Sequence, residues 1–430
     1  MKRWILGGLL CCFAPAWGQA PVQHEVVLTA SAGNKLGIAV PFPQATGVDS
    51  ALLEKEFQAV ILNDLSEAGP FSVIRKDLPR TTDPASYPAW VATGTDWLVL
   101  LKLNRRPSGE LETRLETIDA KPGRAVFSKT YVGRENTLRL MAHTISDELV
   151  ARLTGERGVA ASRIVFARQT APGVKDIFQI DRDGAKTSQI TFYHSLTISP
   201  TVAGDGRLAY VTYKGGYPAI WGQRKAGGPH EKLYPSGEKQ PQGSCFAPCW
   251  SPDGKRLAFA QGDRKGNSDI MVLDLATDRV RRLTDSDCIN TEPSWNPSGN
   301  QLAFTSDRDG GPQIFLMEED GSNVRRLTRE GTYNSSASWS PGGSMIAYVS
   351  RFEGKFDLFV YKLGEGKSYQ ITTGVASSES PAWSPDERRL VFSSGSRGGM
   401  QLYTTDLSGN ALKKLTDYAG SQSPRWVRSR

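Results

Sequence analysis

The sequence predicts a two-domain protein: an α/β N-terminal domain with a mixed sheet and two main helices, followed by an all-β six-bladed β-propeller closed by both chain ends. The propeller prediction rests on a unit of four short strands that recurs along the second part of the chain. Helix and strand patterns alternate instead in the first part, which indicates a separate α/β fold. We place the domains at residues 19–154 and 160–430, with a short linker at 155–161.

The repeat is marked by a tryptophan that ends one strand and by the turn that follows it. The turn WSPDG at 250–254 recurs as WNPSG at 295–299, WSPGG at 339–343 and WSPDE at 383–387, with tryptophans 45, 44 and 44 residues apart. Pro presets φ and Gly accepts positive φ, so these residues suit a tight turn. An apolar strand and two further strands follow each turn. Four short strands in a unit of about 40–45 residues is the period of a propeller blade.

The two ends of the repeat region together complete the ring. Copies of the apolar strand also begin at Arg163 and Arg207, so this strand occurs six times. The first unit lacks an innermost strand, whereas SQSPRW at 421–426 is an innermost strand with no unit after it. One mixed blade built from both ends would close the ring and remove a free sheet edge. The second unit departs from the pattern, and we expect Ile198 of TISP to replace the tryptophan there.

The first domain shows helix and strand patterns in a different order. Residues 49–68 and 136–153 have apolar side chains at helical spacing, and glycine follows each segment. Apolar or alternating runs predict strands at 36–42, 71–75, 97–103, 111–119 and 125–132. These elements predict a mixed sheet covered by two helices.

The chain begins with the pattern of a cleavable secretory signal peptide. Lys2 and Arg3 precede an apolar run, and Ala16-Trp17-Gly18 supplies a small-x-small cleavage pattern, so residues 1–18 should be removed. This pattern predicts an exported, soluble protein in an oxidising compartment. The formal net charge is +7, but acidic and basic residues are interspersed, so we expect no nucleic-acid partner.

The usual signatures of an enzyme are missing from the sequence. There is no G-x-S-x-G nucleophile elbow and no HExxH zinc motif, and the four histidines lie far apart. The segment Asp307-Arg308-Asp309-Gly310 lacks the later ligands of an EF-hand and fits a blade turn better. We therefore expect no catalytic residues, no metal and no cofactor.

Three cysteines precede repeat turns: Cys245 and Cys249 come before WSPDG at 250–254, and Cys288 comes before WNPSG at 295–299. In an extended chain Cys245 and Cys249 would be about 13 Å apart, whereas a disulfide needs Cα atoms within about 7 Å. We expect Cys249 to be a buried free thiol, because it takes a position that is mostly small in the other copies, namely Ser294, Ser338, Ala382 and Arg425. Cys245 and Cys288 should lie in loops at one end of adjacent blades, where a disulfide bridge between them is an open alternative to free thiols.

The whole chain resembles the TolB family, the periplasmic propeller proteins of the Tol-Pal system. Besides the domain order, the resemblance is carried by EVVLTASAGNKLGIAVPF at 25–42, AHTISDELVARLTG at 142–155, NTEPSWNPSGNQLAFTSDRDGGPQIF at 290–315 and the terminal SPRW. It implies a binding role rather than catalysis. TolB-like proteins bind the peptidoglycan-associated lipoprotein Pal through loops at one propeller mouth and TolA through their N-terminal segment. The resemblance also implies a monomer, associated with the outer membrane through Pal, that supports outer-membrane integrity and constriction at division.

The resemblance and the repeat together predict where Pal would bind. Loops before the innermost strands should converge on one face of the ring, and function often lies on loops held by a rigid scaffold. Asn290, Thr291 and Glu292 match the family's pattern, whereas the loop at 244–246 departs from it, which leaves the contacts of that blade open. The predicted Pal-binding residues are Ser244, Cys245, Ala247, Asn290, Thr291, Glu292, Asn334, Ser335, Ser378 and Glu379.

For TolA, the resemblance points to the segment HEVVLTAS at 24–31, and within it to Glu25, Val26, Val27 and Leu28. An extended arm of this kind could add a strand to a partner's sheet. An ordinary edge strand of the first domain explains the same residues equally well. A second hypothesis for the whole protein is a propeller accessory to a periplasmic peptidase or a glycan-binding sensor, which predicts hydrolytic activity or saccharide binding in the channel.

Overall fold

The computed structural model describes residues 35–75, 82–237, 243–352, 354–373, 376–396 and 399–428. The chain divides into two units, Met1–Glu156 and Arg157–Arg430. The predicted signal peptide lies outside the described residues. Among the described residues, no helix combines the length and the apolar character needed to cross a membrane.

The first unit is built on a mixed sheet, as the sequence predicts. Its strands lie in the order β3-β1-β4-β5-β6, with β2 paired to β4. β1 runs parallel to β3 and β4, whereas β4, β5 and β6 form an antiparallel meander. The strands are β1 (Leu36–Ala39), β2 (Gln44–Thr46), β3 (Phe71–Val73), β4 (Trp97–Arg105), β5 (Leu111–Asp119) and β6 (Arg124–Gly133).

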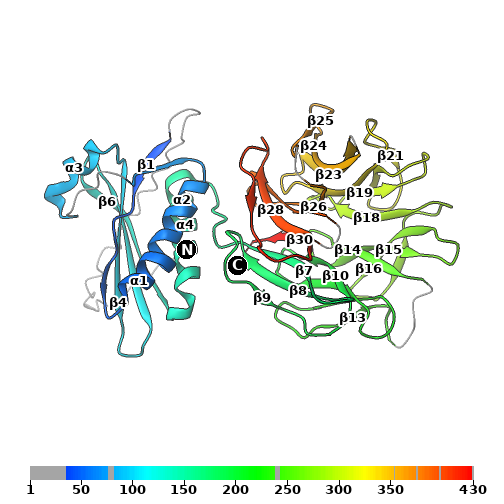
Figure 1. Ribbon diagram of the computed structural model, residues 1–430, viewed down its shortest axis with the longest axis horizontal. Coiled ribbons are helices and arrows are strands. Elements are labelled where there is room, and N and C mark those ends of the chain that lie inside the picture. Colours follow the sequence, from blue (N-terminus) through cyan, green and yellow to red (C-terminus); the bar gives the residue numbers. More distant parts are fainter. Residues whose placement is uncertain are drawn as a thin grey trace, which may run out of the picture. The chain divides into compact units, whose positions relative to one another are not determined.

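Two helical segments pack against one face of this sheet (Figure 1). One runs from α1 (Ser50–Leu53) through the π-helical segment η1 (Glu54–Gln58) into α2 (Ala59–Glu67), and the other comprises η3 (Glu135–Thr137) and α4 (Leu138–Thr154). The apolar residues at helical spacing are buried in both segments: Leu53, Phe57, Val60, Ile61, Leu65, Leu138, Met141, Ile145, Leu149 and Leu153. The apolar residues at helical spacing in the sequence therefore form the faces of the helices that pack into the core.

The opposite face of the sheet carries a short helical element that the sequence patterns did not predict. It consists of η2 (Pro84–Ser86) and α3 (Tyr87–Ala92). Trp90 of α3 packs in one cluster with Ala39 of β1, whereas the neighbouring Ile38 packs with the helices of the other face. Because successive strand residues point to opposite faces, α3 covers the side away from α2 and α4.

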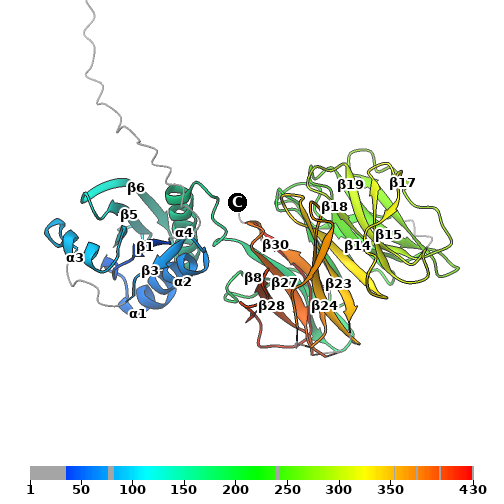
Figure 2. The same cartoon turned by 90° about the horizontal axis from the view of Figure 1, so that it is seen from above.

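The second unit is a six-bladed β-propeller in the part of the chain that the structure describes, and each blade is an antiparallel sheet of four strands (Figures 1 and 2). Blades 1 to 5 follow chain order, and blade 6 holds both ends of the repeat region. The strands, from innermost to outermost, are β10 (Thr197–Val202), β11 (Leu208–Thr212), β12 (Ala219–Gly222) and β13 (Glu231–Tyr234) in blade 1; β14 (Cys245–Trp250), β15 (Arg256–Gly262), β16 (Ser268–Asp274) and β17 (Val280–Arg282) in blade 2; β18 (Asn290–Trp295), β19 (Gln301–Ser306), β20 (Gln313–Glu318) and β21 (Arg325–Arg326) in blade 3; β22 (Asn334–Trp339), β23 (Met345–Phe352), β24 (Lys355–Lys362) and β25 (Lys367–Gln370) in blade 4; β26 (Ser378–Trp383), β27 (Arg389–Ser394), β28 (Gln401–Asp406) and β29 (Lys413–Lys414) in blade 5; and β30 (Ser421–Val427), β7 (Arg163–Ala171), β8 (Val174–Asp181) and β9 (Ser188–Gln189) in blade 6.

Blade 6 joins the two ends of the repeat region, as the sequence predicts. β30 is its innermost strand and pairs antiparallel with β7, from Ser421 opposite Arg168 to Val427 opposite Arg163. Figure 1 shows the red β30 beside the green β7. Trp426 Nε1 also donates a hydrogen bond of 2.8 Å to Ser162 Oγ. The ring is therefore closed by main-chain and side-chain bonds between its first and last segments.

The repeated WSPDG turn is held by its own side chains. In blade 2, Ser251 Oγ donates to Asp253 Oδ1 at 2.5 Å and accepts from Arg256 N at 2.9 Å. Gly254 takes a φ of 66°, which a residue with a side chain rarely adopts. The turn thus connects the innermost strand to the second strand of the blade, and it is scaffold.

Blade 1 differs from the predicted alignment. In blade 2 the final tryptophan of the innermost strand, Trp250, pairs with Leu257 of the second strand. In blade 1 the corresponding pair is Val202 with Leu208. Val202 therefore stands in the tryptophan position, and the expectation that Ile198 does so is wrong. The Ser-Pro of TISP lies inside β10 instead of forming the turn after it.

Candidate functional site

Every innermost strand carries a β-bulge at the same place. The third residue of each strand has a φ of 50–57°, although none of these residues is glycine. The extra residue of a bulge leaves the hydrogen-bond ladder and bends its strand. We call these residues the mouth ring: Ser199, Ala247, Glu292, Ser336, Ser380 and Ser423. Positive φ is uncommon outside glycine, so its repetition in register marks a built feature of the fold.

The mouth ring opens into a channel of about 250 Å³. The third to sixth residues of the innermost strands line this channel, and most of them are small or carry hydroxyl groups. Besides the mouth ring, the lining includes Thr201, Cys249, Ser294, Ser338 and Arg425. A hydroxyl can both donate and accept a hydrogen bond, so the wall suits the binding of a small polar group.

Four of the predicted Pal-binding residues are the first residues of innermost strands, where they are buried: Cys245, Asn290, Asn334 and Ser378. Asn290 Nδ2 donates to Ser268 O at 3.1 Å, and Asn334 Nδ2 donates to Gln313 Oε1 at 2.7 Å. Ser268 and Gln313 both belong to the preceding blade. The prediction that Cys245 and the two asparagines lie in the loops before the innermost strands is therefore wrong, because they begin these strands. The two asparagines fasten neighbouring blades to each other.

The other predicted residues differ in how accessible they are. Ser244 and Glu379 are exposed, Ala247 and Thr291 are half-buried, and Ser335 is buried. These accessible side chains come from blades 2, 3 and 5 and lie beside the mouth ring. The predicted TolA-binding residues, Glu25, Val26, Val27 and Leu28, lie outside the described residues.

Glu292 is the acidic member of the mouth ring. Its carboxylate accepts hydrogen bonds from Thr305 Oγ1 at 2.9 Å, Ser336 N at 2.7 Å and Ser336 Oγ at 2.9 Å. Thr305 belongs to the same blade and Ser336 to the next one. Glu292 therefore joins blades 3 and 4 while it lines the channel.

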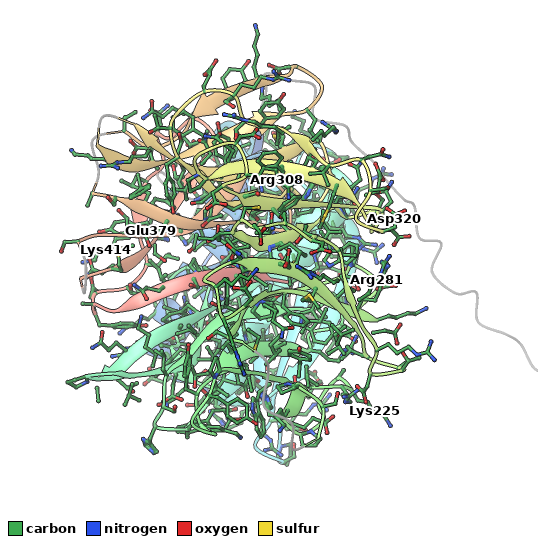
Figure 3. All side chains as sticks on the ribbon, turned by 90° about the vertical axis from the view of Figure 1, so that its right-hand side faces the viewer. Lys225, Arg281, Arg308, Asp320, Glu379 and Lys414 are labelled. Atoms are coloured by element: carbon green, nitrogen blue, oxygen red, sulfur yellow. The ribbon has the colours of Figure 1, made fainter. Side chains whose placement is uncertain are left out.

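Glu379 adds a second acidic group at the mouth, on β26 (Figure 3). Partial burial, reinforced by the nearby charge of Glu292, raises the pKa of Glu379 above its ordinary value. Among the described residues, Glu379 has no hydrogen-bond or ion-pair partner. Its carboxyl group is therefore open to a donor supplied by a docked partner.

The cysteines at the mouth are free thiols, and the possible bridge between Cys245 and Cys288 is not formed. Cys245 Sγ donates to Pro218 O of blade 1 at 3.2 Å, whereas Cys288 Sγ lies 2.9 Å from Ser286 Oγ. The two thiols thus point into different surroundings. Burial raises the pKa of Cys245 to about 12 and also raises the pKa of Cys249. Because thiolates are the reactive form, both groups are poorly suited to nucleophilic or metal chemistry.

The sequence did not identify two arginines near the mouth as site residues. Arg308 follows β19 in a blade turn, yet its Nη2 donates to Asn290 Oδ1 at 2.8 Å and its Nε donates to Ser306 Oγ at 3.0 Å (Figure 3). Arg425 lines the channel. Arg425 could have been recognised from the repeat, because it directly precedes a tryptophan and the aligned residues of the other blades are uncharged.

These features define a class of β-propeller scaffolds: a closed six-bladed ring, fastened blades, a polar mouth and a preceding α/β domain. Such scaffolds present residues from several blades on one rigid face. Comparison with known families identifies the member of this class. A family described as TolB beta propeller domain matches residues 150–430, and one described as TolB amino-terminal domain matches residues 24–126. The chain belongs to the TolB family.

Individual relatives and structures agree with this assignment. The chain is 33% identical over 302 residues to the Tol-Pal system protein TolB of Anaeromyxobacter dehalogenans (strain 2CP-C), covering 67% of this chain and 66% of the relative. It is 34% identical over 199 residues to a protein TolB homolog of Chlorobium chlorochromatii (strain CaD3), covering 46% of this chain and 43% of the relative. The chain thus spans less than two thirds of the length of these curated relatives.

Solved structures extend the similarity to both units. The crystal structure of TolB from Acinetobacter baumannii matches with a TM-score of 0.77 at 25% identity, covering 92% of this chain and 97% of that one. The hydrazine synthase of Kuenenia stuttgartiensis matches with a TM-score of 0.52 at 16% identity, covering 62% of this chain and 46% of that one. The second match reflects the fold alone.

Proposed function

We propose that this protein is the TolB scaffold of a Tol-Pal system, exported to the periplasm by a cleaved signal peptide. In this proposal the propeller mouth binds the peptidoglycan-associated lipoprotein Pal, and the N-terminal segment binds TolA. The protein acts as a monomer without catalysis and supports outer-membrane integrity and constriction at division. Membership of the TolB family and a relative named Tol-Pal system protein support this proposal.

One observation carries the docking proposal: accessible polar side chains sit directly beside residues that are fully buried. Thr291 is half-buried and follows Asn290, which is fully buried and bonded to the preceding blade. Glu379 is exposed and follows Ser378, which is also fully buried. The strands that present the contact residues are therefore held in place before any partner arrives. Such preorganisation lowers the ordering cost of binding.

The test is calorimetric titration of the mature protein, residues 19–430, with the peptidoglycan-binding domain of Pal. The unchanged protein should bind with micromolar or tighter affinity. Glu379→Lys and Thr291→Arg should each weaken binding about tenfold or more, because each places a new positive charge and added bulk at the interface. Asp320→Lys is the matched control, since it makes a similar change of charge in the β20–β21 turn, away from Glu379 (Figure 3).

The mouth is supported as the Pal surface if the two mouth variants lose affinity for Pal while Asp320→Lys keeps the affinity of the unchanged protein. Absence of binding at high micromolar Pal, or an equal loss in the control, would contradict the proposal. Saccharide binding on a glycan array in the absence of Pal binding would favour a glycan sensor instead.

The proposed TolA contact is tested separately, since residues 25–28 lie outside the described part of the chain. Their sequence, EVVL, suits addition of a strand to a partner's sheet. A mature chain that begins at residue 29 should lose capture of TolA and keep its affinity for Pal. Capture of TolA at the original level by the shortened chain would contradict this part of the proposal.

A further inference from the structure

The channel behind the mouth ring contains a charged side chain at a level that is otherwise uncharged. This level is formed by the fifth residue of each innermost strand: Thr201, Cys249, Ser294, Ser338, Ala382 and Arg425. All of these except Ala382 line the channel. Arg425, from β30, therefore carries its guanidinium group into a space bordered mainly by small side chains.

The guanidinium group of Arg425 is almost without partners. Its Nη1 donates to the carbonyl oxygen of the adjacent Pro424 at 2.9 Å, and this is its only hydrogen bond to a described residue. It forms no ion pair with any described carboxylate. A guanidinium group has five N–H donors, so most of its binding capacity is left for something else.

None of the described groups across the channel forms an ion pair with this arginine. Burial lowers the pKa of Arg425, and the nearby charge of Glu292 opposes that shift. The carboxylate of Glu292 is occupied with Thr305 and Ser336. Arginine keeps its proton inside proteins, so a positive charge remains in the channel. A partly desolvated charge without a partner is unfavourable, and a counter-ion would relieve that cost.

We infer that the channel is a binding site for a small carboxylate anion, held by Arg425. Paired N–H groups of a guanidinium match the two oxygens of a carboxylate. The hydroxyl group of Ser338, at the same level, provides a neutral donor. A channel of about 250 Å³ admits a small molecule rather than a folded segment. The acidic Glu292 and Glu379 at the mouth disfavour dianions, so the site should prefer a monocarboxylate to inorganic phosphate.

This site shares Ala247 and Glu292 with the proposed Pal surface, but the binding of an anion to Arg425 requires neither Pal nor TolA. Its test is thermal unfolding of the mature protein in acetate, in phosphate and in chloride at constant ionic strength and pH. Acetate at tenfold above its Kd should raise Tm by about 2 °C or more relative to chloride. Phosphate should raise Tm less than acetate does.

Arg425→Ala should abolish the acetate effect, and alanine is an accepted residue at this level because Ala382 occupies it in blade 5. Arg428→Ala is the matched control, since Arg428 is an exposed arginine three residues further along the same segment. The control should keep the full acetate effect. An equal rise in Arg425→Ala and the unchanged protein would overturn the inference, as would an equal loss in the control.

A spectroscopic measurement keeps the inference testable even where Arg425→Ala folds poorly. Acetate should shift one arginine Nε–Hε resonance in the full mature chain, and that resonance should be missing from Arg425→Met, which keeps the length of the side chain. Absence of any shifted arginine resonance, or its persistence in Arg425→Met, would refute binding at Arg425. Neither outcome bears on the titration with Pal, so the two proposals fail independently.

Discussion

Single buried residues at the propeller mouth act as fasteners between blades. Asn334 is fully buried, and its Nδ2 donates to Gln313 Oε1 and to Glu330 O, each at 2.7 Å. Gln313 Oε1 also accepts from Thr328 Oγ1 at 2.8 Å. The asparagine thus completes a small network that spans two blades. Removing one member of such a network leaves a buried polar group without its partner.

We expect Asn334→Ala to lower the free energy of unfolding of the propeller by about 1–3 kcal/mol. Urea unfolding followed by tryptophan fluorescence measures this change. Thr332→Ala, at an exposed position two residues earlier, should change the free energy of unfolding by less than about 0.5 kcal/mol. Equal losses in the two variants would show that the network does not fasten the blades.

The raised pKa of Glu379 makes stability depend on pH. Because folding favours the protonated carboxyl group, this contribution is complete below the unfolded pKa of about 4.3 and is lost as pH rises through the higher folded pKa. Glu379→Gln should therefore stabilise the protein at pH 7, by about 0.5 kcal/mol or less, since solvent screens an exposed group. The advantage should fade below about pH 4. Thermal unfolding of both proteins across this range would reveal the opposite trend if the sign were wrong.

Residue types alone could not separate docking residues from fasteners. Asn290 and Thr291 are adjacent and both polar, yet the first is fully buried and the second is half-buried. The register of β18 shifts after Thr291, and this bulge decides which side chains turn toward the blade interior. The bulge depends on pairing with β19, which the local sequence does not specify. The general location of the mouth could be predicted, but the role of each residue there could not.

At the scale of elements, the blades interlock through glycine turns. Gly321 lies in the β20–β21 turn with a φ of 92°, and a Cβ atom there would lie 2.5 Å from Leu283 O of the preceding blade. Gly409 and Gly184 make the same approach to the blade before them, at 2.2 Å and 2.9 Å. These turns therefore need glycine for its missing side chain as well as for its backbone freedom.

A pair of substitutions separates these two requirements. Gly310 has nearly the same φ as Gly321, 94°, but a Cβ atom there would meet nothing within 4 Å. Gly310→Ala should cost about 1–2 kcal/mol through backbone strain alone. Gly321→Ala should cost at least about 1 kcal/mol more, because the blades must move apart. Urea unfolding of both variants gives the difference, and equal costs would contradict the interlocking role.

The elements themselves were largely predictable wherever local signals agree. In blades 2 to 5, turn chemistry and apolar pattern specify the same strands, so the first two strands of each blade follow from the sequence. Blade 1 was misaligned because the Ser-Pro pair of TISP imitates the turn, whereas the pairing of Val202 with Leu208 sets the register. α3 escaped prediction because it is short, lacks a side-chain N-cap and is held by burial of Trp90.

At the scale of the whole molecule, the closed ring depends on one short segment, β30. Without β30, β7 would become an exposed inner edge of blade 6. Ile164 and Phe166 of β7 are fully buried in the closed ring. An uncovered apolar edge strand is a template for pairing with other chains. That closure could be predicted from the count of strands, whereas the isolation of Arg425 could not, because it depends on what every other blade places around the channel.

A chain that ends at Gly420 should therefore unfold at a Tm lower by about 10 °C or more and should form oligomers. The matched control is a chain that ends at Arg428, which keeps all of β30. Thermal unfolding and size-exclusion chromatography compare the two chains. A monomeric chain ending at Gly420 with unchanged Tm would show that blade 6 does not need its innermost strand.

The closure also sets a schedule for making the protein. β7 emerges early in the propeller sequence, but its inner neighbour β30 is the last strand of the six blades to be synthesised. At about 5–20 residues per second, the intervening chain takes roughly 12–50 s to appear. A ribosome that stops shortly before residue 421 releases a chain with five whole blades and no ring. Synthesis of residues 421–427 is thus the step that allows the six blades to close into a ring.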